Sequence, residues 1–367
     1  MSDTSPQATF EPVSFLDLPG WKTDDHSAAF DAFLLSATAV LARDNRIAAG
    51  LRVACHTALE LKAAGVVGSA AARSFFEENF APHGARRSSQ AGLLTGYYEP
   101  ELAGSLCRTR AFHVPVLARP PDLVNLVDES QRGALSDRLT HARRTSDGSI
   151  GPYFDRQEID EGTLDGRGLE IAYVADPVDL FFMQVQGSGL IRLKDGSGLR
   201  VGYDGKNGHL YTSLGRKLID TGVFTAEAMN LASLTQWLKA DSTRSRPILW
   251  RNRSYVFFRV LGSERETRTL GTDAIPLTPL RSLAVDTGFH QLGLPIHVSA
   301  PGLDHILDSR DGFHRLMVAH DVGSAIKGPE RGDVFCGSGR AAGAVAGMTK
   351  HPVRFFPLLP KRSGDGD

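Results

Sequence analysis

Three aspartates in the last quarter of the chain carry the residue type best suited to acid–base chemistry. Asp286 follows the apolar run Ser282–Val285, Asp321 follows the run Leu316–His320, and Asp333 comes soon after them behind a Lys-Gly turn. Carboxylates at strand ends can meet at the rim of a barrel, where crowding raises the pKa of at least one of them. We therefore expect a group that can act as a general acid near neutral pH.

Two other interpretations of these aspartates are open. Aspartate at the end of a strand frequently binds turn amides and then has only a local structural role. Three clustered carboxylates are also ligands of the kind that a hard cation such as Ca²⁺ prefers. A metal-dependent activity would be lost in excess chelator.

A second candidate segment runs from Asp179 to Gly189 and holds two glutamines, Gln184 and Gln186. We predict a strand here, on which residues two apart project from the same face. Glutamine amides are suitable partners for the hydroxyl and acetamido groups of a sugar. The alternative is a polar strand edge that faces solvent, since exposed glutamine is common.

Several well-known motifs do not support a nucleotide, serine-hydrolase or zinc-protease function. The segment Gly337–Ala342 has the letters of a dinucleotide fingerprint, but the acidic residue that should follow at about 20 positions is missing. The chain has no Gly-x-Ser-x-Gly, no Gly-Lys-Ser/Thr loop and no His-Glu-x-x-His. Its cysteines, Cys55, Cys107 and Cys336, form no Cys-x-x-Cys pair, which argues against a disulfide framework and a cysteine zinc site. We expect neither a cofactor nor a metal.

The composition is that of a globular protein with room for a sizeable core. The 367 residues are 41% hydrophobic, and 41 basic against 42 acidic side chains leave a net charge of −1. This balance argues against a nucleic-acid partner, which needs a basic excess. No window approaches about 18 consecutive apolar residues, so we expect no transmembrane segment. The first residues show no signal peptide and no lipidation cysteine.

The elements that must position these residues change in type along the chain. The first 90 residues carry helical periodicity, for example after Asp25 and from Ser69 onward. From Leu93 on, short β-rich runs alternate with Gly-, Asp- and Pro-rich turns, which is typical of barrels. Predicted strands are the runs 112–117, 171–174, 181–185, 190–193, 199–203, 248–250, 254–260, 283–285, 295–298, 313–319 and 354–357. We predict a mainly β protein with N-terminal helices.

Several motifs, taken in order, resemble those of the membrane-bound lytic murein transglycosylase A family. They are Leu94–Pro100 (LTGYYEP), Phe182–Gly189 (FMQVQGSG), Val201–Gly208 (VGYDGKNG), Asn252–Phe258 (NRSYVFF) and Ala319–Gly328 (AHDVGSAIKG). With Asp286 and Asp333 they cover about residues 90 to 357. A set of long motifs in one order is more specific than any single short pattern.

The resemblance implies a fold of two domains. A double-psi β-barrel, built from residues 1–102 and 246–367, would carry the three aspartates. A smaller β-barrel would be inserted at residues 103–245. The groove between the two domains would hold a glycan strand, and we expect a monomer.

For function, the resemblance implies cleavage of the β-1,4 bond between N-acetylmuramic acid and N-acetylglucosamine in peptidoglycan, with a 1,6-anhydro end as product. Asp333 matches the family's catalytic aspartate, and Asp321 and Asp286 match the other two. Because the sugar's own C6 hydroxyl is the nucleophile, one carboxyl group can act first as acid and then as base. We assign that role to Asp333, with Asp321 holding geometry and tuning its pKa, and Asp286 in support.

The candidates for glycan contact are Thr95, Tyr97, Gln184, Gln186, Ser188 and Lys327. Lys327 either stabilises charge or stays solvated. Two other functions remain open. One is a hydrolase of the same bond, in which Asp333 and Asp321 form the two-carboxylate pair of an ordinary glycosidase. The other is a glycan-binding module without turnover. The family works in the periplasm, anchored at the outer membrane.

Overall fold

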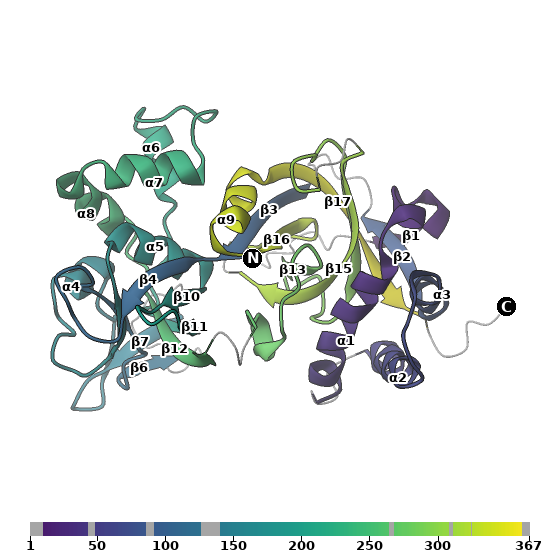
Figure 1. The fold of residues 1–367 in the computed structure, drawn as a ribbon, viewed down its shortest axis with the longest axis horizontal. Helices are drawn as coiled ribbons and strands as arrows, with labels where there is room; N and C mark the ends of the chain where they lie inside the picture. Colours follow the sequence, from purple (N-terminus) through teal and green to yellow (C-terminus); the bar gives the residue numbers. More distant parts are fainter. Residues whose placement is uncertain are drawn as a thin grey trace, which may run out of the picture. The chain divides into compact units, whose positions relative to one another are not determined.

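The computed structural model describes residues 10–42, 48–85, 92–125, 140–263, 268–307, 311–323 and 325–361. The chain divides into two compact units, and Figure 1 labels most of their helices and strands. The first holds Met1–Tyr98, Arg268–Gly337 and Ala341–Asp367, and the second holds Glu99–Thr267 and Ser338–Arg340. The division therefore falls inside two strands, one after Tyr98 and the other after Gly337.

Six strands of the first unit close into a barrel. Their order is β17-β14-β15-β13-β16-β3, and β3 pairs with β17 to complete the ring. The strands are β3 (Gly92–Glu99), β13 (Ser282–Val285), β14 (Pro295–Ala300), β15 (Phe313–Val322), β16 (Arg331–Ser338) and β17 (Lys350–Pro360). Two short strands, β1 (Phe10–Pro12) and β2 (Phe80–Ala85), extend the sheet from β17.

The barrel is filled with aliphatic and aromatic side chains. Leu94, Val298, Met317 and Phe355 are among those that are fully buried there. β14 is buried along its whole length, as expected of a strand that is covered on both faces. Its outer face meets the segment before the first helix, where the His297 ring lies edge-on to Trp21 with ring centroids 5.7 Å apart.

Three N-terminal helices pack on the outside of the barrel. They are α1 (His26–Ala42), α2 (Ala49–Ala63) and α3 (Ser69–Asn79). The helices share an apolar cluster with Leu316 of β15 and Leu358 of β17, and Figure 1 draws them beside these strands. Ahead of α1, the buried Asp24 accepts two hydrogen bonds from Arg281, at 2.8 and 2.9 Å, which ties this segment to the start of β13. The predicted N-terminal helices are confirmed.

The second unit is built on a six-stranded sheet whose two edges meet. The order is β12-β11-β10-β4-β9-β5, and Ala118, next to β5, bridges to Phe258 of β12. The strands are β4 (Glu101–Ser105), β5 (Val114–Leu117), β9 (Glu170–Val174), β10 (Ser188–Arg192), β11 (Gly198–Lys206) and β12 (Val256–Ser263). A smaller sheet holds β6 (Leu123–Asn125), β7 (His141–Arg144) and β8 (Ile150–Gly151).

Helices of the second unit replace two of the predicted strands. They are α4 (Arg156–Asp160), α5 (Pro177–Gln186), α6 (Leu214–Asp220), α7 (Leu231–Lys239) and α8 (Ser242–Trp250). The predicted strand 181–185 is wrong because α5 has an Asp176 N-cap, proline as its first residue and Gly187 at φ 80° as its C-cap. The predicted strand 248–250 is wrong because it is the last turn of α8. As a whole the protein is mixed α and β rather than mainly β.

The second unit reaches beyond the predicted insertion of residues 103–245. β4 begins at Glu101, and β12 pairs with β11 from Val256 to Ser263. Backbone pairing therefore keeps these residues in the second unit, which continues to Thr267. The helix α9 (Gly339–Met348) follows directly on β16.

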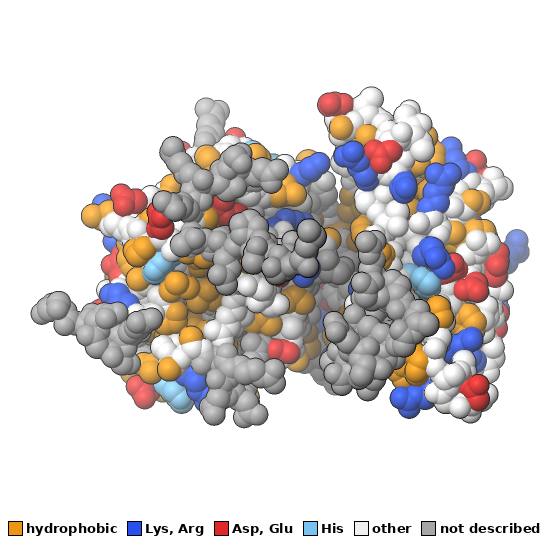
Figure 2. Space-filling model, turned by 180° about the vertical axis from the view of Figure 1, so that it is seen from behind, with side chains coloured by type: hydrophobic (Ala, Val, Ile, Leu, Met, Phe, Trp, Pro, Cys, Tyr) orange, Lys and Arg blue, Asp and Glu red, His pale blue; other side chains and the backbone are white. Residues whose placement is uncertain are grey.

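The surface carries charges of both signs. On the face drawn in Figure 2, basic and acidic side chains are intermingled among the described residues. Within the described ranges, no helix has both the length and the apolar character that a membrane crossing requires.

Candidate active site

Two of the three aspartates lie opposite the same residue of the barrel. In the pairing of β13 with β15, Ala284 lies opposite Asp321, and in the pairing of β13 with β16 it lies opposite Asp333. Paired residues share a face of the sheet, and strands are about 4.8 Å apart, so the two Cα atoms are separated by roughly 10 Å. The residue between them, Ala284, has only a methyl group as its side chain.

Asp333 lies on β16 and has one charged partner. Its Oδ1 accepts a hydrogen bond from Nη1 of Arg331 at 2.7 Å, and 22% of its side chain is exposed. Burial raises the pKa of Asp333 above its ordinary value, although the guanidinium of Arg331 acts in the opposite direction. The carboxyl group therefore keeps its proton to a higher pH than a free aspartate does, which suits a general acid.

Asp321, near the end of β15, is surrounded by hydrogen-bond donors. Its Oδ1 accepts from the backbone N–H of Thr272 at 3.1 Å, the hydroxyl of Thr272 at 2.9 Å and the N–H of Val322 at 2.9 Å. Its Oδ2 accepts from the phenol of Tyr97 at 3.1 Å. Burial nevertheless raises the pKa of Asp321, and these donors act in the opposite direction. The donors fix the position of the carboxylate.

The short helix η4 (Thr272–Ala274) that presents Thr272 has an unusual backbone. Asp273 and Ala274 both have positive φ angles, 56° and 57°. An alanine in this region of φ costs free energy and persists only where the surrounding structure requires it. The turn that contains these two residues begins at Thr272, whose N–H and hydroxyl both donate to Asp321.

Thr95 and Tyr97 lie two apart on β3 and therefore share a face of the strand. The ring of Tyr97 contacts Phe335, with centroids 5.3 Å apart, and its hydroxyl donates to Asp321. Burial, with the neighbouring Asp321, raises the pKa of the Tyr97 phenol well above its ordinary value. Between the two residues, a Cβ on Gly96 would lie 2.8 Å from the Cα of Ala346 in α9. Glycine thus lets α9 pack closely on this strand.

Asp286 is held by the backbone rather than by the other two acids. It accepts from the N–H groups of Gly288 at 3.1 Å and Gly328 at 2.9 Å, and Nζ of the exposed Lys327 lies 3.6 Å from it. Burial acts to raise the pKa of Asp286, but these donors and the Lys327 ammonium outweigh it and lower the pKa. The local structural role weighed from the sequence describes this aspartate well.

The candidate glycan-binding residues of the second unit are not arranged as predicted. Gln184 and Gln186 lie on helix α5, so they are about 200° apart around its axis instead of sharing a strand face. Gln184 is 4% exposed, and its amide accepts from Arg156 at 2.7 Å and donates to the carbonyl of Val256 at 3.1 Å. Gln186 and Ser188 are half-buried, and Ser188 begins β10.

Two residues beside the acids were missed by the sequence analysis. Arg331 had a signal, because it stands two positions before Asp333 and thus on the same face of a strand. Thr272 had none, since it reaches Asp321 across 49 positions of the chain. Among the described residues, no three His, Cys, Asp or Glu side chains are grouped as a metal site would require.

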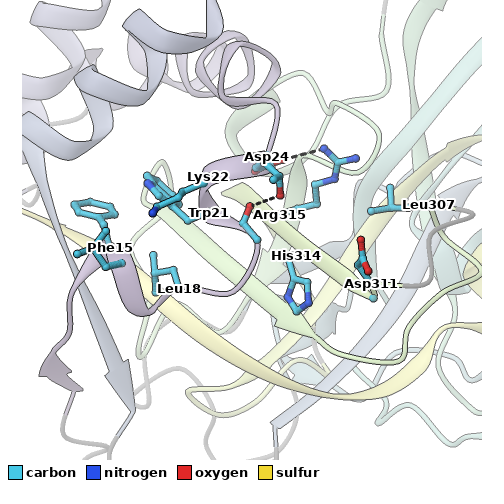
Figure 3. A pocket seen from close by; sticks show the side chains of 13 residues that line it. Phe15, Leu18, Trp21, Lys22, Asp24, Leu307, Asp311, His314 and Arg315 are labelled. Carbon is cyan, nitrogen blue, oxygen red and sulfur yellow. Dashed lines mark hydrogen bonds and ion pairs between the residues drawn. The ribbon is translucent and has the colours of Figure 1, made fainter.

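A hollow of about 640 Å³ lies elsewhere in the first unit. Figure 3 shows its lining, in which Arg315 donates to Asp24 at 2.9 Å and Trp21 and Phe15 form an apolar side. Its residue His314 is seven positions from Asp321 on β15, roughly 23 Å along an extended strand. The hollow is therefore separate from the acidic site.

The protein thus combines a six-stranded barrel that carries the aspartates with a second unit rich in β-strands. Two family models match these parts of the chain. The MltA specific insert domain matches residues 93–259, and the 3D domain matches residues 281–359. Membrane-bound lytic murein transglycosylase A of Vibrio cholerae is 37% identical over 207 residues, which are 55% of this chain and 55% of that protein. The chain thus matches about half the length of this curated relative.

Solved structures extend the similarity to nearly the whole chain. The membrane-bound lytic murein transglycosylase from Agrobacterium tumefaciens is 37% identical, with a TM-score of 0.85 over 96% of this chain and 98% of that one. Escherichia coli MltA with bound chitohexaose is 27% identical, with a TM-score of 0.68 over 98% of this chain and 93% of that one. This chain belongs to the MltA family of lytic murein transglycosylases.

Proposed function

We propose that this protein is a lytic transglycosylase that cleaves the β-1,4 bond between N-acetylmuramic acid and N-acetylglucosamine in peptidoglycan. Family membership and the glycan oligomer bound by the Escherichia coli relative support this substrate class. The observation that carries the proposal is the register of β13, which sets Asp321 and Asp333 on one face on either side of Ala284.

In the proposed reaction Asp333 acts first as an acid. It gives its proton to the glycosidic oxygen while the bond from that oxygen to C1 of N-acetylmuramic acid breaks. The C6 hydroxyl of the same sugar then bonds to C1, and its proton passes to the Asp333 carboxylate. No water is consumed, and the carboxyl group is protonated again at the end. An intramolecular nucleophile benefits from a high effective concentration, so one catalytic carboxyl group is sufficient.

Asp321 has a different role in this proposal. Four hydrogen bonds from Thr272, Val322 and Tyr97 hold its carboxyl group in place and act against the burial that raises its pKa. A fixed carboxylate on the same face as Asp333 stabilises the positive charge that develops at C1 when the bond breaks. Thr95 and Ser188 remain candidates for glycan contact, and Tyr97 is better explained as a positioning residue for Asp321.

A hydrolase of the same bond is the second candidate, because an ordinary glycosidase also uses a pair of carboxyl groups beside the scissile bond. In that case Asp333 would protonate the glycosidic oxygen and Asp321 would activate water. The products differ: hydrolysis leaves a reducing end, whereas the proposed reaction leaves a 1,6-anhydro end.

The experiment is mass spectrometry of purified peptidoglycan after incubation with the wild-type protein and with Asp333→Asn. We expect soluble fragments ending in 1,6-anhydro-N-acetylmuramic acid from the wild type and a loss of at least about 10³-fold in their rate of release with the variant. Binding of peptidoglycan without fragments from either protein would overturn the proposal in favour of a glycan-binding module.

Three finer assignments belong to the same proposal. We assign the barrel strands a double-psi connection, the second unit a role in holding the glycan, and the protein a location at the outer membrane on its periplasmic side. The relatives' description as membrane-bound supports the location. The monomeric state and the groove between domains stay predictions.

A further inference from the structure

The residue that touches Asp333 most directly is Arg331. Its Nη1 donates to Oδ1 of Asp333 at 2.7 Å and to the carbonyl of Gly332 at 2.6 Å. The side chain of Arg331 is 17% exposed, so this ion pair is screened less than one on the open surface. A charge-assisted bond of this length fixes the rotamer of both side chains.

The contact occupies only one of the two carboxylate oxygens. Among the described residues, the hydrogen bond to the Asp333 side chain is the one from Arg331 to Oδ1, and none is made to Oδ2. The contact favours a proton on Oδ2, because Oδ1 already accepts a hydrogen bond from a cationic guanidinium and is the less basic of the two oxygens. Arg331 thus favours Oδ2 as the atom that carries the proton.

Within the described part of the chain, Arg331 pairs with Asp333 and with none of the other acidic side chains nearby. Continuing the β13–β16 register places Asp286 opposite Arg331, but Asp286 is already held by Gly288, Gly328 and Lys327. Tyr97 from β3 and Cys336 on β16 also lie close enough to feel the charge of Asp333, and Asp321 is two strands away on β15. Among these groups only Arg331 and Lys327 are cations.

We infer that Arg331 is a positioning residue for the reaction, which holds Oδ1 of Asp333 and leaves Oδ2 to deliver the proton and take it back. This inference rests on the proposed function of Asp333. Burial favours the protonated carboxyl group, and the guanidinium favours the carboxylate that forms after proton transfer. A group that must both give and take a proton works best when these two forms are close in free energy.

Two variants of Arg331 test this role. Arg331→Gln keeps a hydrogen-bond donor but removes the charge, and Arg331→Lys keeps the charge but loses the planar fork. Arg73→Gln is the matched control, because Arg73 also makes a 2.7 Å bond to a carboxylate of the first unit, Glu77 on α3. Thermal unfolding checks that each variant folds, and Arg331→Lys keeps the test open if Arg331→Gln does not.

The measurement is the pH dependence of kcat and kcat/KM for release of soluble fragments. Activity falls as pH rises through the pKa of a group that must begin protonated. In Arg331→Gln we expect this fall in activity, the alkaline limb of the pH profile, to move to higher pH. We also expect kcat to fall at least about tenfold and KM to stay unchanged. In Arg331→Lys the limb stays closer to that of the wild type. A lower kcat with an unmoved limb, or a rise in KM alone, would overturn the inference.

A second readout separates this inference from the proposed function. The ¹³C NMR signal of the Asp333 carboxyl carbon, assigned by its absence in Asp333→Asn, reports its titration without any substrate. We expect its midpoint to lie at higher pH in Arg331→Gln than in the wild type. An identical midpoint would contradict the inference even if peptidoglycan is cleaved. Absence of anhydro fragments from the wild type would contradict the proposed function and leave the titration result standing.

Discussion

At the scale of single residues, burial and hydrogen bonding divide the three aspartates. Asp333 has one partner and a raised pKa, whereas Asp286 is held by backbone donors and has a lowered pKa. Asp321 has several hydrogen-bond donors, as Asp286 does, but burial outweighs them and its pKa is raised, as that of Asp333 is. Three identical side chains on neighbouring strands thus differ in pKa because their burial and hydrogen-bond partners differ.

The raised pKa of Asp333 makes a prediction about stability. A carboxyl group whose pKa is higher in the folded state contributes stability at low pH and loses it as pH rises through the folded pKa. We therefore expect the free energy of unfolding of Asp333→Asn, relative to the wild type, to increase from acidic to neutral pH. Denaturant titrations at several pH values measure this difference.

The exposed Asp31, with 64% of its side chain accessible, provides the control variant Asp31→Asn. Its difference from the wild type is expected to vary less over the same range. A flat difference for Asp333→Asn would mean that the folded and unfolded pKa values of Asp333 are the same.

A second prediction at this scale concerns Thr272. Thr272→Val removes the hydroxyl that donates to Asp321 at 2.9 Å and keeps the shape of the side chain and its backbone donor. We expect kcat/KM to fall about tenfold, since a hydrogen bond to a charged group is lost, with little change in Tm. Thr57→Val, which removes a hydroxyl bonded to a carbonyl within α2, is the control. Unchanged activity in Thr272→Val would mean that this hydroxyl is not needed to hold Asp321 for the reaction.

At the scale of the elements, the sequence predicts most of the strands but not the helix α5. The run of phenylalanine, methionine and valine in this segment has the composition of a strand, while Asp176, Pro177 and Gly187 are helix boundary signals on either side of it. Reading those boundaries first would have placed Gln184 on a helix. The prediction of a sugar-binding strand face failed for that reason.

The carboxylate pair itself could be predicted only in part. Aspartates after apolar strands indicate a barrel rim, but which residues oppose one another depends on the register, and β13 has an irregular pairing between Leu283 and Ala284. The contact of Tyr97 with Asp321 joins residues 224 positions apart. Local sequence patterns carry no information about such a distant pair, and the contact becomes visible only in the folded structure.

The place of Gln184 on helix α5, where it is buried against Arg156, leads to a prediction about the stability of the second unit. Arg156 is buried and donates to Gln184 and to the carbonyls of Asn252 and Ser254. Gln184→Ala leaves this buried cation short of an acceptor, which we expect to cost about 1.5–3 kcal/mol of unfolding free energy. Gln157→Ala, at an exposed glutamine of α4, is the control. A higher KM with unchanged stability would instead restore Gln184 as a glycan contact.

At the scale of the whole molecule, all three aspartates lie in the first unit, and the second unit is also built on a six-stranded sheet whose edges meet. The strands β3 and β16, which carry Tyr97 and Asp333, each run on from the first unit into the second. At their ends, Glu99 is buried and accepts from Arg200 at 2.9 Å and from Ser338 at 2.9 Å. Glu99, which forms a buried ion pair with Arg200, therefore links the end of β3 to the end of β16.

The central claim is that the sugar's own hydroxyl, and not water, attacks C1. The most direct test is digestion of purified peptidoglycan in H₂¹⁸O by the wild-type protein, with Asp333→Asn as the control, followed by mass spectrometry of the fragments. We predict fragments that end in 1,6-anhydro-N-acetylmuramic acid and contain no ¹⁸O, and a strong loss of these fragments with the variant. Reducing ends that carry one ¹⁸O atom would contradict the claim and identify the protein as a hydrolase.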